Sequence, residues 1–205
     1  MSKMSDQIKS KLICITGKPG NGKTHFANYL KENGYKVFIM DEWVHQFYKI
    51  GNKGYELIKK EFGFQYVNEI EVDRKKLANL IFNDTDAKTK LDNLIFKEIY
   101  DLICNLKILD KTIFVELGIY AINPAFFKNL FKFIIAIDSQ RFLEKNPYIS
   151  KFYENIKFST KAVENSKNSG KYSIVYVDYI VENLGDLENF EKNIKNLLKE
   201  IHDKI

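Results

Sequence analysis

Residues 17–24 of the chain read Gly-Lys-Pro-Gly-Asn-Gly-Lys-Thr, a complete G-x-x-x-x-G-K-[ST] phosphate-binding loop. The preceding residues, 11–16, are a short apolar, β-branched run that predicts a buried strand. The following residues, 25–30, place apolar side chains at helical spacing, and Gly34 is a helix stop. A strand, a glycine-rich turn and a helix in this order are the context that such a loop requires. The sequence therefore predicts a nucleoside triphosphate site rather than a chance match in a turn.

Each part of the predicted loop has a chemical task. Glycines let the backbone turn its N–H groups inward around an anion, and the helix that follows adds the positive end of its dipole. Lys23 is expected to reach the β- and γ-phosphates, and the Thr24 hydroxyl to ligate Mg²⁺. ATP and Mg²⁺ are thus the expected cofactors, held by Gly17, Lys18, Pro19, Gly20, Asn21, Gly22, Lys23 and Thr24.

Composition narrows the class of protein without choosing a function. A chain of 205 residues with 45% hydrophobic and 29% charged residues predicts a globular single domain with room for inserted segments. The net charge of +5 is spread along the chain and suits a phosphorylated small molecule about as well as nucleic acid, so the charge decides nothing. We expect small-molecule partners, with no nucleic acid and no membrane. Cys14 and Cys104 are expected to fill the core rather than form a disulfide. No signal-peptide pattern opens the chain, so we expect a cytoplasmic protein whose oligomeric state is unknown.

Strand and helix patterns alternate along the rest of the chain. This alternation predicts an α/β fold with a doubly wound, five-stranded parallel sheet, in a single domain over 1–205. We expect a helical acceptor-binding insertion over about 42–107 and a polar, helix-like lid over about 140–172. After the first strand, the expected strands are 36–40, 112–117, 131–137 and 175–181, and the expected helices are 54–62, 74–82, 88–106 and 187–201.

Other residues discriminate among the classes of phosphate-loop protein. The base-reading motif Asn-Lys-x-Asp of GTPases is missing, since Asn52-Lys53 is followed by Gly54-Tyr55. The third predicted strand does not end in the Asp-Glu pair that is typical of larger ATPases. Asp41 follows the second predicted strand, where small kinases place a carboxylate that accepts the proton of the acceptor hydroxyl. It could also be the N-cap of a helix over 42–48. Both roles stay open, and the pattern favours a small-molecule kinase.

Four further segments resemble bacterial dephospho-CoA kinases. Residues 41–45 read Asp-Glu-Trp-Val-His, an aspartate four residues ahead of a basic residue. Residues 72–77 are similar to a family segment that begins Asp-Arg, and 141–145 match a lid entry with lysine in the second basic position. Residues 177–185 are close to the family's A-D-x-V-I-x-N-x-G. The resemblance runs from Leu12 to Gly185. The phosphate loop alone is not specific to the family, whereas the Asp73-Arg74 and Asp178…Asn183 elements are moderately specific.

The resemblance implies transfer of the ATP γ-phosphate to the ribose 3′-hydroxyl of dephospho-coenzyme A. For two of the residues that the resemblance assigns to the acceptor site, a purely structural role is the alternative. His45 could be an ordinary helix-surface residue, and Arg74 could form a surface ion pair with Asp73 or a nearby acid. Trp43 either lines the acceptor pocket or packs in the core. The resemblance implies catalytic roles for Lys23, Asp41 and Arg141, and contacts with the acceptor for Asp41, His45 and Arg74. It places Arg141 and Lys145 at the hinge of the lid. It also implies that Asn183 and Gly185 contact the adenine and that Thr24 and Glu116 ligate Mg²⁺.

The chain departs from the family pattern in three places. Residues 115–120 stand where the family has a proline-rich segment, and Phe96-Lys97 stand where the family usually has a His-Pro pair. Residues 146–172, in the predicted lid, contain lysines but no arginine. Lysine does not reproduce the bidentate fork of arginine. Two explanations for the lysines in the lid therefore remain open: drift toward an A+T-rich base composition, and loss of the family's acceptor specificity. The alternative functions are another small-molecule kinase, for a nucleoside, nucleotide or sugar, and a catalytically weak nucleotide-binding regulatory protein.

Overall fold

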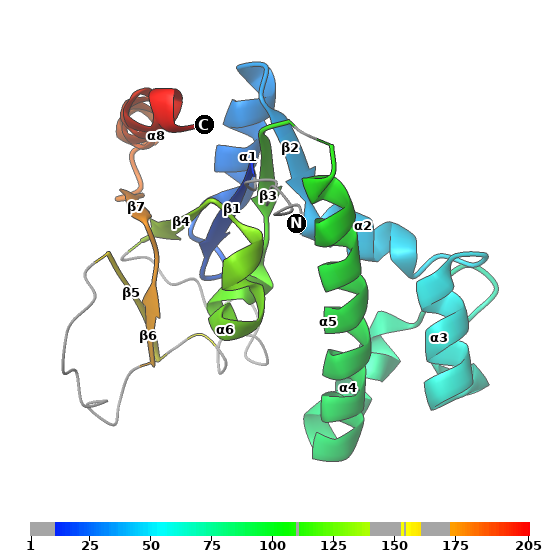
Figure 1. Ribbon diagram of the computed structural model, residues 1–205. Helices are drawn as coiled ribbons and strands as arrows, with labels where there is room; N and C mark the ends of the chain where they lie inside the picture. The colour runs from blue at the N-terminus through cyan, green and yellow to red at the C-terminus, as the bar shows by residue number, and fades with distance from the viewer. Residues whose placement is uncertain (1–10, 110, 140–152, 154, 161–172) are drawn as a thin grey trace, which may run out of the picture. The chain divides into compact units, whose positions relative to one another are not determined.

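The computed structural model describes residues 11–109, 111–139, 153, 155–160 and 173–205. The chain divides into two compact units, shown in Figure 1. We call Met1–Phe38 with Ile103–Ile205 the sheet unit, and Ile39–Leu102 the helical unit. Most of the predicted lid, including Arg141 and Lys145, lies beyond the described ranges. Within those ranges, no helix has the length and apolar character needed to cross a membrane.

The elements follow the predicted alternation through most of the chain. The sheet unit holds β1 (Leu12–Gly17), α1 (Lys23–Glu32), β2 (Lys36–Ile39, whose last residue begins the other unit), β3 (Ile113–Glu116), η2 (Gly118–Ala121), α6 (Pro124–Phe127), η3 (Lys128–Leu130), β4 (Phe133–Asp138), β5 (Ile156–Ser159), β6 (Ser173–Tyr176), β7 (Tyr179–Glu182), α8 (Leu187–Ile201) and η4 (His202–Lys204). The helical unit holds α2 (Met40–Phe47), α3 (Lys53–Phe62), η1 (Phe64–Tyr66), α4 (Arg74–Asn83) and most of α5 (Thr85–Lys107).

The main sheet has five strands in the order β2-β3-β1-β4-β7. β1 pairs in parallel with β3 and with β4, and β4 pairs in parallel with β7. These pairings and the covering helices confirm the predicted doubly wound α/β fold. Because the carboxyl ends of parallel strands meet at one edge, the segments after β1, β3, β4 and β7 gather there.

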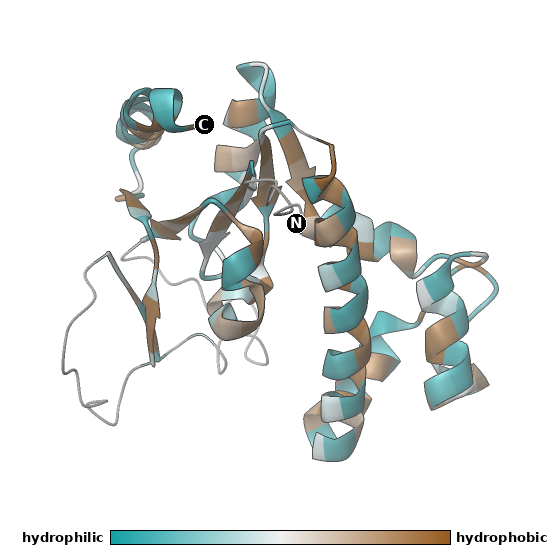
Figure 2. Ribbon diagram, in the orientation of Figure 1, coloured by the Kyte–Doolittle hydropathy of each residue, from teal (hydrophilic) through white to brown (hydrophobic). Residues whose placement is uncertain are grey.

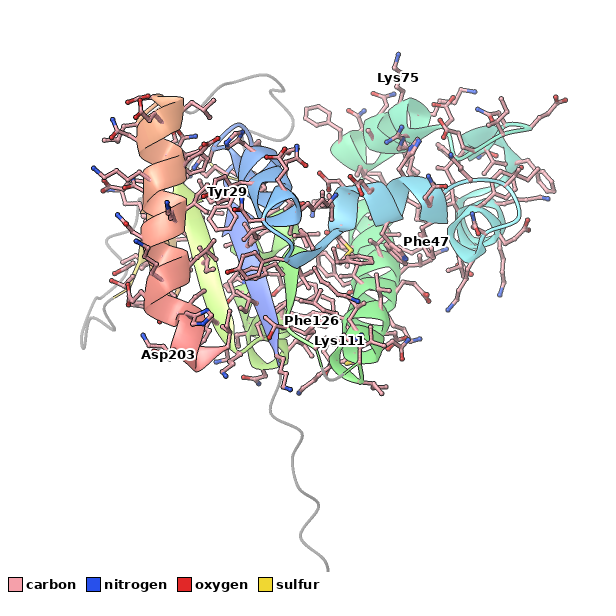
Figure 3. The ribbon with its side chains drawn as sticks, turned by 90° about the horizontal axis from the view of Figure 1, so that it is seen from above. Tyr29, Phe47, Lys75, Lys111, Phe126 and Asp203 are labelled. Atoms are coloured by element: carbon pink, nitrogen blue, oxygen red, sulfur yellow. The ribbon has the colours of Figure 1, made fainter. Side chains whose placement is uncertain are left out.

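The core of the sheet unit forms between one face of the sheet and two helices. β1 is buried along its whole length, as expected for a central strand covered on both faces. Figure 3 shows α1 and α8 side by side over the strands, with Tyr29 among the partly buried residues packed against their core. In Figure 2 α8 is brown on one side and teal on the other. Its buried face comprises Phe190, Ile194, Leu197, Leu198 and Ile201.

The predicted single strand over 175–181 is wrong. The structure divides this segment into β6 and β7, and β6 forms a separate two-stranded parallel sheet with β5. Asp178 lies at the break, where its Oδ2 accepts a 2.7 Å hydrogen bond from Ile134 N and its own N–H donates to Ile134 O at 2.9 Å. These bonds anchor the chain at the start of the β4–β7 pairing. β5 also shows that part of the expected helix-like lid is a strand.

Backbone pairing and charged contacts join elements of the helical unit, in addition to buried apolar side chains such as Ile58, Leu77 and Ile99. Val72 N donates to Tyr48 O at 2.9 Å, which joins the residue after α2 to the segment that enters α4. Lys53 at the start of α3 forms a 2.6 Å ion pair with Glu98 of α5, whose side chain is 12% exposed. Such contacts link the helices of a unit that has no sheet of its own to organise it.

Candidate active site

The phosphate loop connects the buried strand β1 to helix α1, as predicted. Its backbone is bent at three glycines with positive φ: Gly17 (150°), Gly20 (82°) and Gly22 (102°). Asn21 N donates to Lys18 O at 3.2 Å, which closes a tight turn inside the loop. L-residues with a side chain rarely adopt such φ angles, so the loop path depends on glycine at these positions.

The loop is also too closely packed for side chains at two of its glycines. A Cβ on Gly17 would lie 2.6 Å from the carbonyl oxygen of Ile137 in β4. A Cβ on Gly22 would lie 2.6 Å from Asn183 Nδ2 and 3.1 Å from Phe190 Cε1. The motif glycines therefore serve both the bend of the loop and its close contact with the neighbouring elements.

The N-terminus of α1 is prepared for an anion. Gly22 is the N-cap and provides no side-chain hydrogen bond, and the first turn contains no acidic residue. The N–H groups of the first turn, which have no partner within the helix, and the positive end of the helix dipole are therefore not matched by a capping carboxylate. Lys23 and Thr24 are the first two residues of α1, so the predicted phosphate ligand and the predicted Mg²⁺ ligand are adjacent at this helix end.

The ammonium group of Lys23 folds back over the loop. Its Nζ donates to Gly17 O at 3.0 Å and to Lys18 O at 3.1 Å. Gly118, at the start of η2, lies beside it: a Cβ there would come 3.4 Å from Lys23 Cε. Tyr153, buried and distant in sequence, donates from its hydroxyl to Gly118 O at 3.2 Å. Gly118 is thus a neighbour of the loop lysine, and Tyr153 contacts Gly118; sequence reasoning gave neither residue a role.

Glu116 occupies the last position of β3 and is 4% exposed. Its register partner on β1 is Ile15, so it lies at the same sheet edge as the phosphate loop. Burial, with a smaller contribution from the Glu116 charge, raises the pKa of the Cys14 thiol well above its usual value. Cys14 and Cys104 are both free thiols. Hydroxyl and carboxylate oxygens are ligands that Mg²⁺ prefers, so Thr24 and Glu116 have the chemistry for it.

In the helical unit, Asp41 is an exposed residue in the first turn of α2. The interpretation of Asp41 as an N-cap is wrong, because α2 begins at Met40, its N-cap is Ile39, and no side chain caps it. His45 follows one turn later and is partly exposed. Trp43 stacks on the buried ring of Phe47 with centroids 4.5 Å apart, so this helix packs through its aromatic residues.

Arg74 is exposed as the first residue of α4. The alternative in which it pairs with Asp73 is wrong: Asp73 caps the helix through Lys76 N at 3.0 Å and pairs with Lys76 Nζ at 3.6 Å. Arg74 has no carboxylate partner within the described part of the chain. It lies near Tyr48, whose pKa burial raises to about 12 while the Arg74 charge opposes the increase. The guanidinium is therefore available to a ligand.

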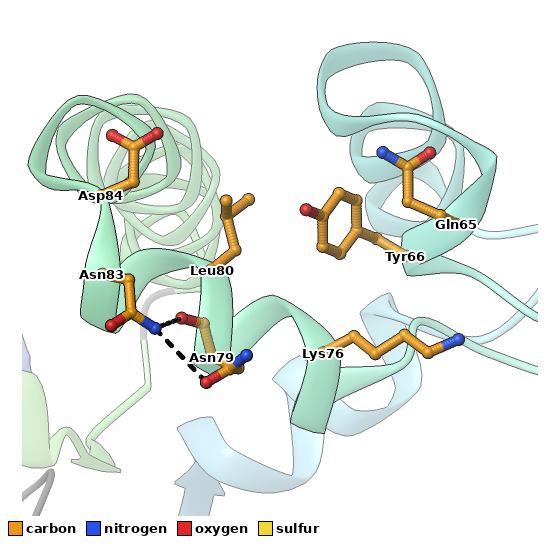
Figure 4. A pocket seen from close by; sticks show the side chains of 7 residues that line it. All are labelled: Gln65, Tyr66, Lys76, Asn79, Leu80, Asn83 and Asp84. Atoms are coloured by element: carbon orange, nitrogen blue, oxygen red, sulfur yellow. Dashed lines mark hydrogen bonds between the residues drawn. The ribbon is translucent and has the colours of Figure 1, made fainter.

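A pocket of about 410 Å³ lies between η1 and α4 (Figure 4). Tyr66 and Leu80 face one another across it, and Asn83 Nδ2 is bonded to Asn79 O at 2.8 Å. Sequence reasoning predicted no pocket here, although Lys76 belongs to the segment 72–77 quoted above, because only the packing of η1 against α4 brings the lining residues together. The lining consists of Gln65, Tyr66, Lys76, Asn79, Leu80, Asn83 and Asp84.

The fold and the loop define the class of protein: an α/β protein in which a phosphate-binding loop follows the central strand of a parallel sheet. A protein-family model described as dephospho-CoA kinase matches residues 11–135. The dephospho-CoA kinase of Aquifex aeolicus is 30% identical over 206 residues, which cover 93% of this chain and 97% of the relative. The chain therefore belongs to the dephospho-CoA kinase family, as the resemblance indicated.

A further relative agrees with this membership, and a solved structure agrees with the fold. The dephospho-CoA kinase of Mycoplasma genitalium is 39% identical over 133 residues, which cover 62% of this chain and 66% of the relative. The solved structure of a dephospho-CoA kinase from Campylobacter jejuni matches with a TM-score of 0.62 at 20% identity, over 93% of this chain and 96% of that one. The structural match supports the fold.

Proposed function

We propose that this protein is an ATP-dependent kinase that transfers the γ-phosphate to the ribose 3′-hydroxyl of dephospho-coenzyme A, forming coenzyme A. The observation that carries the proposal is similarity to a dephospho-CoA kinase over 93% of the chain, which includes an intact phosphate loop. The uncapped N-terminus of α1 supports the nucleotide half of the reaction.

On the nucleotide side, the loop N–H groups and Lys23 would hold the β- and γ-phosphates. Lys23 would exchange its bonds to Gly17 O and Lys18 O for phosphate oxygens and offset the charge that develops during transfer. Thr24 and Glu116 would hold Mg²⁺, which neutralises phosphate charge when bound. The segment from Asn183 to Gly185, next to the loop, would meet the adenine through its backbone.

On the acceptor side, Asp41 would accept the proton of the 3′-hydroxyl as that oxygen attacks the γ-phosphorus. Its exposed position, without a capping role, leaves the carboxylate available for this task. His45, one turn along α2, and Arg74 would bind the anionic acceptor, and the planar guanidinium of Arg74 suits a phosphate group. Arg141 would contribute the second arginine, from the predicted lid.

An acceptor panel tests the proposal. The full-length chain is incubated with ATP and Mg²⁺ and with dephospho-coenzyme A, adenosine, AMP, shikimate or a hexose, and ADP formation and phosphorylated product are both measured. We expect coenzyme A formation to exceed every other transfer by at least about a hundredfold, because specific hydrogen-bonding sites discriminate at this level or above. Preferred transfer to another acceptor would support a different small-molecule kinase. ATP binding without any transfer would support the regulatory alternative.

A further inference from the structure

The side chain of Asn183 is bonded to the phosphate loop. Asn183 follows β7, and its backbone N–H donates to Asp138 O at the end of β4 at 2.8 Å. Its side-chain Nδ2 donates to Asn21 O at 3.0 Å, and its Oδ1 accepts from Gly185 N at 3.1 Å. The acceptor and one donor of the amide are therefore used within the protein, and the loop is one of the partners.

Asn21 is held from a second direction as well. It is completely buried, and its Nδ2 donates to Ile137 O in β4 at 2.9 Å. Its side chain is thus fixed to the sheet while its carbonyl oxygen is fixed to Asn183. Asn183 Nδ2 also lies close to Gly22, since a Cβ placed on Gly22 would be only 2.6 Å from it. The side-chain amide of Asn183 is therefore directly beside the peptide that joins Asn21 to Gly22.

The peptide between Asn21 and Gly22 has two groups that point in opposite directions. The chain has no cis peptide bond in its described residues, and in a planar trans peptide the C=O and the next N–H are antiparallel. Because the Asn21 carbonyl points toward Asn183, the Gly22 N–H points away from it. Glycine tolerates either orientation of such a peptide, so a bonded partner is needed to select one.

We propose that Asn183 is a positioning residue that fixes the orientation of the Asn21–Gly22 peptide and thereby aims the Gly22 N–H at the bound phosphate. Gly22 is the N-cap of α1, so its N–H belongs to the group of donors that an anion meets at this helix end. The inference rests on nucleotide binding at the loop, but not on the identity of the acceptor. It gives the Asn183 side chain a task distinct from contact with adenine.

Inorganic tripolyphosphate separates the two tasks, because it contacts the loop and has no base. Binding of ATP and of tripolyphosphate is measured by calorimetry for the wild-type chain and for Asn183→Ala. We expect both affinities to fall by about tenfold to a hundredfold, the effect of losing one hydrogen bond to a charged group. ¹⁵N-glycine labelling gives a direct readout: the ligand-induced shift of the Gly22 amide signal should shrink, while that of Gly34 stays unchanged.

Two further variants keep the test decisive. Asn183→Asp keeps the acceptor for Gly185 N but replaces the donor to Asn21 O, so it should lose tripolyphosphate affinity at least as strongly. Asn189→Asp is the control: it adds the same charge in the first turn of α8, where Asn189 bonds to Asp186. This variant should change the affinities for ATP and tripolyphosphate little. Loss of ATP affinity alone, with tripolyphosphate binding and the Gly22 signal unchanged, would overturn the proposal in favour of adenine contact. Transfer to dephospho-coenzyme A by the wild type is scored separately and tests the proposed function.

Discussion

The ammonium group of Lys23 donates a 3.0 Å hydrogen bond to the carbonyl oxygen of Gly17, the residue that opens the phosphate loop. A second bond, to Lys18 O at 3.1 Å, holds the side chain across the loop. A lysine held in this way is already positioned where phosphate oxygens are expected, so little side-chain entropy remains to be lost when the nucleotide binds.

Replacement of Lys23 by Met tests the electrostatic role of this lysine. Met keeps most of the apolar stem and removes the charge, so transfer should fall by at least about a hundredfold, as for the loss of one preorganised donor. The control is Lys31→Met, a lysine in the last turn of the same helix, which should keep near-normal turnover. Steady-state kinetics and thermal unfolding together make the comparison. Normal turnover in Lys23→Met would contradict the phosphate-loop role.

Gly22 and Gly34 form a matched pair of glycines. Both have positive φ, 102° and 83°, but a Cβ at Gly22 would collide with Asn183 while Gly34 has no atom within 4 Å of that position. Gly34→Ala should therefore cost only the left-handed backbone penalty of about 1–2 kcal/mol in urea unfolding, with ATP affinity unchanged. Gly22→Ala should abolish ATP binding. Equal ATP affinities in the two variants would show that the close packing does not matter.

Asp41→Asn separates proton transfer from binding. Because Asp41 does not cap α2, the substitution should leave thermal stability almost unchanged. We expect turnover to fall by about 10²–10⁴, the span for loss of a general base, with ATP affinity retained. Glu42→Gln changes the adjacent exposed carboxylate of the same turn and is the control. Equal turnover in the two variants would remove Asp41 from the mechanism.

The two thiols should differ in reactivity. Burial and the Glu116 charge raise the pKa of Cys14, so its thiolate is scarce at pH 8 and reagents have no access to it. In the native protein, Ellman's reagent should therefore modify Cys104 alone, and Cys14 should react only after addition of guanidinium chloride. Fast modification of a Cys104→Ser variant without denaturant would contradict the burial of β1.

The cap at Asp73 predicts a pH dependence of stability. Its backbone hydrogen bond from Lys76 N lowers the pKa of this carboxyl below the ordinary value of 3.8. A lowered folded-state pKa means that the stabilisation is complete above the unfolded-state pKa and is lost as the pH falls through the folded-state pKa. The difference in Tm between wild type and Asp73→Ala should thus be constant from pH 7 to 5 and shrink below pH 4. A constant difference down to pH 2 would exclude a charged cap.

The sequence alone determined the features that depend on local pattern. The strand, loop and helix around residues 12–32 and the amphipathic helix α8 follow from apolar periodicity and from glycine positions, which act within a few residues. The family resemblance placed Asp41, Arg74 and Asn183 among the functional candidates, and the order of these segments is readable without a structure.

Only the tertiary structure decided which distant residues meet. The division of 175–181 into β6 and β7 depends on the hydrogen bonds of Asp178 with Ile134, and no apolar pattern encodes a partner 44 residues away. The bond from Asn183 to Asn21 O joins positions 162 residues apart and brings the segment after β7 against the phosphate loop. Contacts of this kind arise when parallel strands bring their carboxyl ends to one edge, so the role of a side chain there is set by its neighbours in space.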